Sequence, residues 1–289
     1  MSGHLHERVL GWYDDHARVL PWREPAASAW AVLVSEFMLQ QTPVARVLPV
    51  FEQWMHRWPA AADLALAPTG DAVRAWGRLG YPRRALRLHG AATMIVGAHG
   101  GEVPASYDAL RALPGVGDYT AAAVASFAFG QRHVVLDTNV RRVFARAFGG
   151  AEFPAATPTR AERELATGLL PDDEATSAAW AVAVMELGAL VCSAASPSCD
   201  DCPVKDVCAW RAAGYPAYDG PPRRVQTYAG TDRQCRGRLL GMLREAHETV
   251  HRSRLDVAWS NEEQRNRCLD GLVHDGLAVR LSEDTYALP

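Results

Sequence analysis

The helical spacing of apolar residues is the feature that most constrains how this chain can fold. From about Glu7 to Leu190, apolar side chains recur every three or four residues, and proline or glycine separates one such segment from the next. This period places apolar side chains on one face of a helix, whereas a half-buried strand alternates them. We therefore predict an all-α body. Its expected helices cover residues 31–38, 44–54, 71–79, 84–99, 107–113, 119–129, 140–148, 160–169 and 175–190.

Composition narrows the class of protein. With 289 residues, 48% of them hydrophobic, the chain can bury a substantial core. Arg, Asp or Gly interrupts every apolar run before it could cross a bilayer, and no charged and then apolar leader opens the sequence. We expect a globular, cytoplasmic monomer that does not contact membranes. The net charge of −3 leaves nucleic acid open as a partner, because a total charge does not say where the positive side chains lie.

Four of the six cysteines fall in one short stretch after the last of these helices. Cys192, Cys199, Cys202 and Cys208 have the spacing C-x6-C-x2-C-x5-C, in a Pro- and Ser-rich segment that a bound ion would have to organise. Four thiolates in one loop can hold zinc or a four-iron cluster, and ligand chemistry alone does not choose between them. Unliganded cysteines are the poorer interpretation, since exposed thiols oxidise. Cys235 and Cys268 lie elsewhere and are expected to be ordinary, partly buried thiols.

A separate small unit is predicted after a proline-containing linker at residues 214–230. In it Ser260 is expected to cap a helix, with Glu263 completing a capping box. The final residues, LAVRLSEDTYALP, read as two short strands around a Ser-Glu-Asp turn. The expected helices cover residues 232–246, 254–259 and 261–274. Helix, helix, helix, hairpin is the order of a winged helix, although a docking or dimerisation module is an equally good interpretation of residues 231–289.

Two neighbouring motifs suggest a nucleic-acid site. The segment LPGVGDYTA, residues 113–121, is either a plain connection between helices or a helix-hairpin-helix, in which Gly115 and Gly117 bring backbone N–H groups close to a DNA phosphate. It is followed by VVLDTNVRRV, where Asp137 could simply be the N-cap of the next helix. Its position after the hairpin favours a functional role for this carboxylate.

Several motifs, in the right order, resemble the MutY-type adenine DNA glycosylases of the helix-hairpin-helix, endonuclease III superfamily. They are LPWR, SEFMLQQTPV, GRLGYPRRALRLHGAA, LPGVGDYTAAAVASFAFG, VLDTNVRRV and MELGALVC, and they span most of residues 7–210. The cysteine spacing is also that of this family and implies a [4Fe-4S] cluster. The C-terminal unit resembles the tail of actinobacterial members and not the Nudix-like domain that many MutY proteins use to inspect 8-oxoguanine.

The resemblance implies a domain plan and an activity. The six-helix barrel domain with the hairpin would cover residues 23–132, and the cluster domain residues 1–22 and 133–213. The expected activity is hydrolysis of the N-glycosidic bond of adenine mispaired with 8-oxoguanine or G, in double-stranded DNA, during base excision repair. Such chemistry needs a proton for the leaving base and a negative charge beside the developing positive sugar.

The resemblance assigns these roles to particular residues. Glu36 matches the general acid that protonates adenine N7, and its apolar neighbours would raise its pKa as that role requires. Asp137 matches the carboxylate that stays ionised beside the sugar. The remaining matches are Asn139 and Tyr119, which hold water and sugar, and Glu186, an acidic residue near the base pocket.

DNA contacts are carried over in the same way. Leu39, Gln41 and Tyr81 match residues that fill the gap left by the flipped base and probe its partner, although each could equally be core. Arg23, Gly115 and Gly117 complete the expected DNA-binding set. The basic residues Arg83, Arg84 and Arg87 either track phosphates or form a solvated helix face.

Other positions bear on the reaction type. Tyr119 stands where endonuclease III carries its Schiff-base lysine, and the only lysine of this chain is Lys205 in the cysteine loop, so we predict a monofunctional glycosylase without lyase activity. Pro82 and Pro43 depart from the family pattern, and residues 193–198 lack the basic side chains that relatives place against DNA. The rival interpretations are a thymine or uracil mismatch glycosylase and a non-catalytic iron–sulfur DNA-binding regulator.

Overall fold

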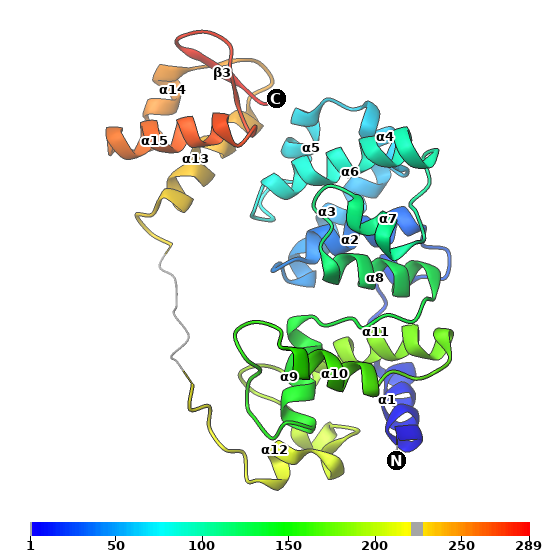
Figure 1. Ribbon diagram of the computed structural model, residues 1–289. Helices are drawn as coiled ribbons and strands as arrows, with labels where there is room; N and C mark the ends of the chain where they lie inside the picture. Colours follow the sequence, from blue (N-terminus) through cyan, green and yellow to red (C-terminus); the bar gives the residue numbers. More distant parts are fainter. Residues whose placement is uncertain (1, 221–227) are drawn as a thin grey trace. The chain divides into compact units, whose positions relative to one another are not determined.

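The computed structural model describes residues 2–220 and 228–289, and the protein is almost wholly helical (Figure 1). Its contacts divide the chain into two compact units. The first comprises Met1–Val32, Ala105–Arg111 and Val116–Pro222, and the second comprises Leu33–Pro104, Ala112–Gly115 and Arg223–Pro289. The all-α prediction is confirmed, and every helix predicted for the body is present with ends that differ by a few residues. The predicted domain boundaries stay a prediction. Within the described ranges, no helix is both long and apolar enough to span a bilayer.

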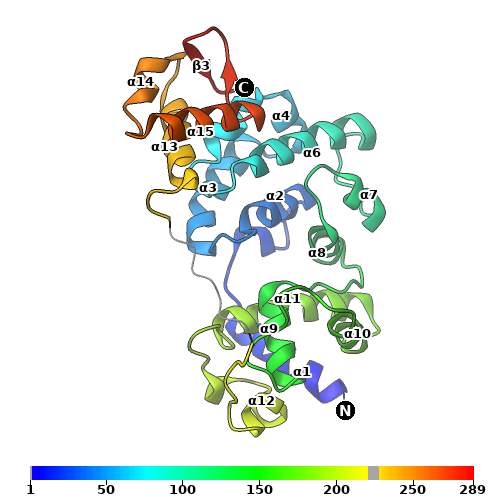
Figure 2. The same ribbon diagram turned by 60° about the vertical axis from the view of Figure 1, so that its left-hand side comes forward.

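The first unit is built around one central helix, α11. Its regular elements are α1 (Ser2–His16), a 3₁₀ turn (Pro21–Arg23), α7 (Tyr107–Ala112, ending in the second unit), α8 (Asp118–Phe129), α9 (Thr138–Ala147), α10 (Arg160–Gly168), α11 (Glu174–Leu190) and α12 (Ala209–Ala212). Helix α11 packs on α9, α1 and α8, and Figure 2 shows α9 and α1 against it. Val140, Phe144, Trp180 and Leu187 form the core between these helices.

The helical part of the second unit surrounds a tryptophan-rich core. It contains α2 (Ala29–Leu39, begun in the first unit), α3 (Val44–Arg57), α4 (Ala61–Leu66), α5 (Thr69–Ala75) and α6 (Arg83–His99). Trp54 makes edge-to-face contacts with Trp58 and Trp76, and such aromatic pairs add to the stabilisation from burial alone. Helix α4 was not predicted, because its six residues are too short for a periodicity to be recognised.

The C-terminal part contains the predicted helices and hairpin and one additional strand. Its elements are α13 (Asp232–Glu245), β1 (Val250–His251), α14 (Arg252–Asp256), α15 (Glu262–His274), β2 (Val279–Arg280) and β3 (Thr285–Ala287). The strands form an antiparallel sheet in the order β1-β3-β2, in which Val250 pairs with Tyr286. Strand β1 was not predicted, because its two residues are too few to show an alternation of apolar and polar side chains. The assignment to the winged helices stays a prediction.

Three local predictions in this region need correction or restriction. Helix α15 is capped by Asn261, whose side chain accepts a hydrogen bond from Gln264 N at 2.8 Å, and not by Ser260 with Glu263. The cap therefore lies one residue later, at another side chain that is equally suited to it. Cys235 and Cys268 are fully buried and not partly buried. Of the predicted linker, residues 214–220 and 228–230 contain no helix or strand, and residues 221–227 lie outside the described residues.

Candidate functional site

Asp137 lies at the first turn of α9 and caps it. Its Oδ1 accepts a hydrogen bond from Val140 N at 2.6 Å, and its Oδ2 accepts one from Asn139 Nδ2 at 2.8 Å. Burial raises the pKa of Asp137 above its usual range, opposed by these hydrogen bonds and by the charge of Arg142. Asp137 is therefore the N-cap of α9, as the sequence allowed. The same cap leaves a partly buried carboxylate that is held chiefly by neutral donors.

Arg142 connects this turn to the cysteine loop. Its guanidinium donates to Asn139 Oδ1 at 2.7 Å, to Gly188 O at 2.6 Å and to Cys192 O at 2.7 Å. The close approach of α9 and α11 depends on Gly188, because a Cβ there would lie 2.7 Å from Asn139 Cβ. Sequence analysis attached no role to Arg142 or Gly188, although both lie inside the quoted motifs. Their role requires knowing which helices touch, and one sequence does not show that.

The four predicted metal ligands line one cavity. Cys192, Cys199, Cys202 and Cys208 share it with apolar side chains of α9, α11 and α12. Within residues 2–220 and 228–289, no set of three or more His, Cys, Asp or Glu side chains is placed to hold a single metal ion. All four cysteines therefore border one shared space.

Arg146 fastens the cysteine loop to α9. It donates to Cys192 Sγ at 3.4 Å and to Ser193 O at 2.7 Å, while its own carbonyl lies 3.6 Å from Cys208 Sγ. Its guanidinium also stacks over Trp210, 4.6 Å from the ring centroid. Arg146 thus contacts two of the four thiols, Cys192 through its guanidinium and Cys208 through its backbone carbonyl. Helix α9 carries Asp137 at one end and this contact at the other.

Glu186 is completely buried on α11, but its charge is balanced. Arg18 donates to both carboxylate oxygens at 2.7 Å, and Arg23 donates to Oε2 at 3.0 Å. Although burial alone would raise the pKa of Glu186, these two arginines lower it to about 2. Arg23, which was predicted to bind DNA, is thus occupied by a carboxylate of the same unit. The pair joins the segment after α1 to the centre of α11.

The hairpin residues differ in what their glycines do. Gly115 has φ +82°, and a Cβ there would lie 2.7 Å from Arg87 Cβ and 2.9 Å from Phe37, so the turn and the packing both require glycine. Gly117 is the extended N-cap of α8, and a Cβ there would meet nothing within 4 Å. Its surroundings are open to a ligand at a helix N-terminus. Tyr119, two residues later, packs partly buried against the small core of α8.

Glu36 belongs to the second unit and lies in the middle of α2. The residue is 4% exposed, and residues on both sides of it are fully buried. Glu36 is therefore not a solvated surface carboxylate. Its predicted partnership with Asp137 of the first unit stays a prediction.

Two strained turns of the second unit are tied together by one arginine. Gln41 and Tyr81 both have positive φ, 56° and 45°, which is uncommon for residues other than glycine. Arg84 donates to Phe37 O at 2.9 Å and Gln40 O at 2.6 Å on one turn, and to Gly80 O at 3.2 Å on the other.

Arg84 is buried, and burial lowers its pKa to about 10, so it does not track phosphates as one interpretation had it. Its neighbour Arg83 pairs with Asp275 at 3.1 Å. Arg84 holds the turns that present three side chains. Tyr81 is 51% exposed, Gln41 is exposed, and Leu39 is partly buried. These are the three residues predicted to enter DNA.

Comparisons with known proteins agree with this geometry. Residues 34–169 match the HhH-GPD superfamily of base excision DNA repair proteins. The chain is 54% identical over 282 residues to an adenine DNA glycosylase of Mycobacterium tuberculosis, covering 97% of this chain and 92% of that protein. It is 51% identical to the adenine DNA glycosylase of Mycolicibacterium smegmatis, covering 97% and 94%. A solved structure of a thermostable thymine-DNA glycosylase is similar with a TM-score of 0.65 and 26% identity, covering 73% of this chain and 97% of that one.

Proposed function

The chain belongs to the adenine DNA glycosylases of the helix-hairpin-helix superfamily, and from this premise we propose that it releases adenine mispaired with 8-oxoguanine or G from double-stranded DNA. The setting of Asp137 carries the proposal. Its carboxylate is partly buried and held by Val140 N and Asn139, which are neutral donors. Its negative charge therefore remains available to a developing positive sugar, where low polarity strengthens the attraction.

Glu36 supplies the proton in this proposal. It is 4% exposed, so a proton on its carboxyl group is shielded from bulk water. Glu36 protonates adenine N7, and the C1′–N9 bond breaks with its electron pair passing to the base. Water then adds to C1′ and gives up a proton, which restores the Glu36 carboxyl group. Asp137 stabilises the positive sugar, while Asn139 and Tyr119 orient sugar and water. Glu186 already balances Arg18 and Arg23, so we assign it a positioning role.

Single-turnover release of adenine from a duplex with A opposite 8-oxoguanine tests the proposal. Asp137→Asn and Glu36→Gln should each abolish release while leaving duplex binding largely intact, because each removes a group needed in the transition state. Asp173→Asn is the matched control, since Asp173 caps α11 by accepting from Thr176 N at 2.8 Å and is exposed. Undiminished release by Asp137→Asn would refute the proposal.

The cysteine cavity fits a [4Fe-4S] cluster, which we propose as the resident cofactor. Cys192, Cys199, Cys202 and Cys208 would hold it, and Arg146 would face its negative charge. Four thiolates that border one space can hold such a cluster, and the C-x6-C-x2-C-x5-C spacing is that of the family. When bound, the cluster would hold the loop in shape. Iron and sulfide content with visible absorption test this: Cys199→Ser should lose both signals, whereas Cys235→Ser should keep them.

We also propose that the enzyme has no Schiff-base lyase activity. Its only lysine, Lys205, lies in the cysteine loop and donates to Asp200 O at 2.6 Å. Borohydride should therefore fail to trap the enzyme on substrate DNA when the N-terminal amine is blocked. A covalent complex under these conditions would contradict the assignment.

A thymine glycosylase is the second candidate, because a structure of that activity shares the fold. A panel of duplexes holding A, T or U opposite G and 8-oxoguanine separates the two. The buried Glu36 favours adenine, since a purine N7 needs an acid for its departure. A non-catalytic regulator would instead be indifferent to Asp137→Asn.

A further inference from the structure

The exposed ring of Tyr81 is flanked by two guanidinium groups from different parts of the second unit. Arg84 lies 5.3 Å from the ring centroid, and Arg233 of α13 lies 5.6 Å from it. Arg233 also lies 5.7 Å from the ring of Tyr228, which is 52% exposed. Tyr81, Arg233 and Tyr228 thus form an exposed array, here called the Tyr81 stack, in which the guanidinium contacts both rings.

The C-terminal part is fixed to the helices that carry Tyr81. Arg244 donates to Val73 O at 2.9 Å and also to Gly77 O, and Arg74 donates back to Ala246 O at 2.7 Å. At the end of the chain, Pro289 packs so closely on Gly70 that a Cβ there would lie 2.4 Å from its carbonyl oxygen. Helix α13 is therefore held where Arg233 meets Tyr81.

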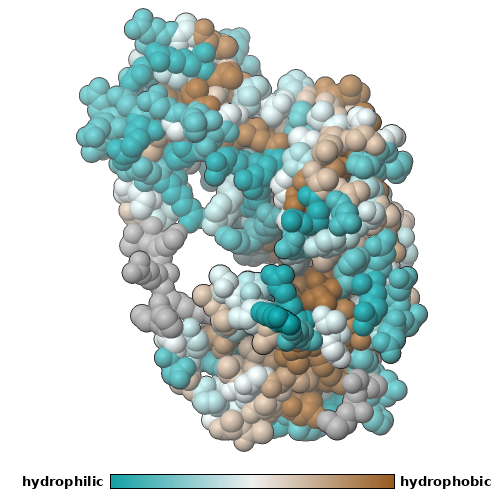
Figure 3. All heavy atoms as spheres, viewed as in Figure 1, coloured by the Kyte–Doolittle hydropathy of each residue, from teal (hydrophilic) through white to brown (hydrophobic). Residues whose placement is uncertain are grey.

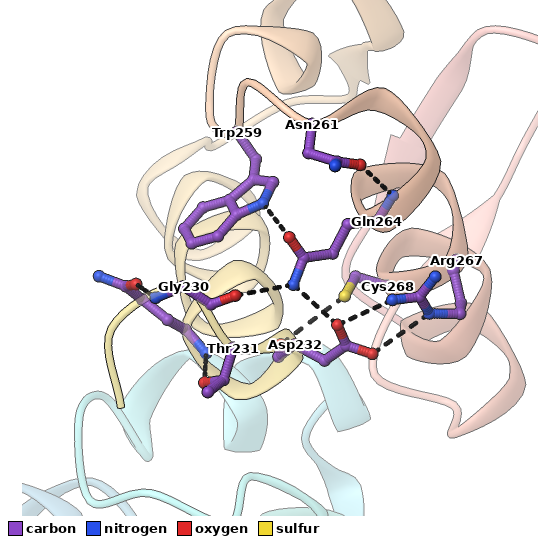
Figure 4. Close-up of polar contacts among 9 residues, drawn as sticks. Gly230, Thr231, Asp232, Trp259, Asn261, Gln264, Arg267 and Cys268 are labelled. Atoms are coloured by element: carbon purple, nitrogen blue, oxygen red, sulfur yellow. Dashed lines mark hydrogen bonds and ion pairs between the residues drawn. The ribbon is translucent and has the colours of Figure 1, made fainter. Parts of the chain in front are cut away.

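Helix α15 is poorly suited to contact DNA itself. Arg267 binds Asp232 of α13 at 3.0 Å, as Figure 4 shows, and Arg265 binds Asp256 at 2.9 Å. The first turn carries Glu262 and Glu263, which would repel phosphates. Figure 3 shows a mostly hydrophilic surface over this part of the chain. The charges of α15 therefore do not favour its use as a recognition helix.

We propose that Arg233 of the C-terminal part binds DNA beside Tyr81 and helps the enzyme to hold the strand opposite the target adenine. The proposal rests on the adenine glycosylase function. Aromatic faces stack on nucleobases, and a guanidinium whose plane lies against rings keeps its in-plane N–H groups free for an oxygen or nitrogen acceptor. On DNA that acceptor is the O6 and N7 edge of a purine or a backbone phosphate.

Arg233→Ala tests the proposal, with Arg238→Ala as the matched control. Arg238 lies on the same helix, is exposed, and stacks over an aromatic ring, Trp259, at 5.2 Å. Arg233→Ala should weaken binding to a duplex with A opposite 8-oxoguanine by about tenfold. Arg238→Ala should bind like wild type, and both variants should keep the wild-type Tm.

Two further measurements identify what Arg233 contacts and whether it acts through the Tyr81 stack. If Arg233 contacts a phosphate, Arg233→Ala should lower the salt dependence of binding equally for G and 8-oxoguanine duplexes. If it contacts a purine edge, Arg233→Ala should change the ratio of adenine release from the two duplexes. Tyr81→Ala combined with Arg233→Ala should bind no worse than Tyr81→Ala alone.

Equal binding by the Arg233→Ala and Arg238→Ala variants would overturn the proposal. The binding assay does not depend on base release. If the wild-type enzyme fails to release adenine, the proposed function is refuted. The role of Arg233 is decided separately, by comparing duplex binding of the Arg233→Ala and Arg238→Ala variants.

Discussion

Two carboxylates of the first unit, one buried and one partly buried, show how local partners decide what an acidic residue does. The pKa of Glu186 is lowered to about 2 by Arg18 and Arg23, whereas burial dominates at Asp137 and raises its pKa. Glu186 is therefore a structural anion with its charge neutralised. At Asp137 the hydrogen bonds and the charge of Arg142 oppose the effect of burial without cancelling it, and a carboxyl group perturbed in this way is typical of a functional site.

Glu186 should make the stability of the protein depend on acid in a defined direction. A carboxyl with a lowered folded-state pKa stabilises the protein above its unfolded-state pKa of about 4.5, and this stabilisation is lost as pH falls towards about 2. At pH 7 Glu186→Gln should reduce the free energy of unfolding by on the order of 3 kcal/mol. Denaturant unfolding between pH 3 and 7 measures this. The difference from wild type should shrink towards pH 3, and a constant difference would contradict the assignment.

At the scale of the helix, α9 connects the candidate catalytic turn to the cysteine loop. Its N-terminus carries Asp137 and Asn139, and Arg142 one turn later joins Asn139 to Cys192 O. Helix α11 supplies the other partner, Gly188 O. A continuous series of hydrogen bonds thus connects the cysteine loop to Asn139 and Asp137.

Arg142→Gln should impair base release more than folding. The shorter amide cannot reach all three acceptors, so Asn139 loses the contact that orients its hydrogen bond to Asp137. We expect single-turnover release to fall by about tenfold or more, because a misplaced catalytic group is costly. Arg141→Gln is the control, since Arg141 is on the same helix but binds Glu162 at 2.9 Å. Equal losses in the two variants would show a general effect on α9.

The elements also show what one sequence can and cannot reveal. Helical periodicity predicted the body, and motif positions predicted Asp137 at a helix start, because both signals are local. Short elements such as α4 gave no period. The sequence did not reveal that Arg84 links the turns at Gln41 and Tyr81, because its acceptors are backbone carbonyls of residues far apart in sequence. The need for glycine at position 188 was also missed, because it arises from the close approach of the neighbouring helix α9.

At the scale of the whole chain, the C-terminal part is docked on the helical part of the second unit. Arg244 is largely enclosed, and burial lowers its pKa to about 10 while it donates to carbonyls of α5 and the turn after it. A charged group withdrawn from water is tolerated only with such acceptors. The residues that dock this part are thus different from Arg233, which is exposed.

Arg244→Ala should therefore loosen the docking and reproduce the effect of Arg233→Ala on DNA. Without Arg244, Val73 O and Gly77 O lose their donor, and α13 no longer holds Arg233 at Tyr81. Hydrogen exchange should become faster around residues 70–77, and duplex binding should weaken by about tenfold. Arg254→Ala, an exposed change on α14, should alter neither measurement. If hydrogen exchange becomes faster but duplex binding is undiminished, DNA binding does not depend on the docking of α13. The Tyr81 stack would then lie outside the DNA-binding surface.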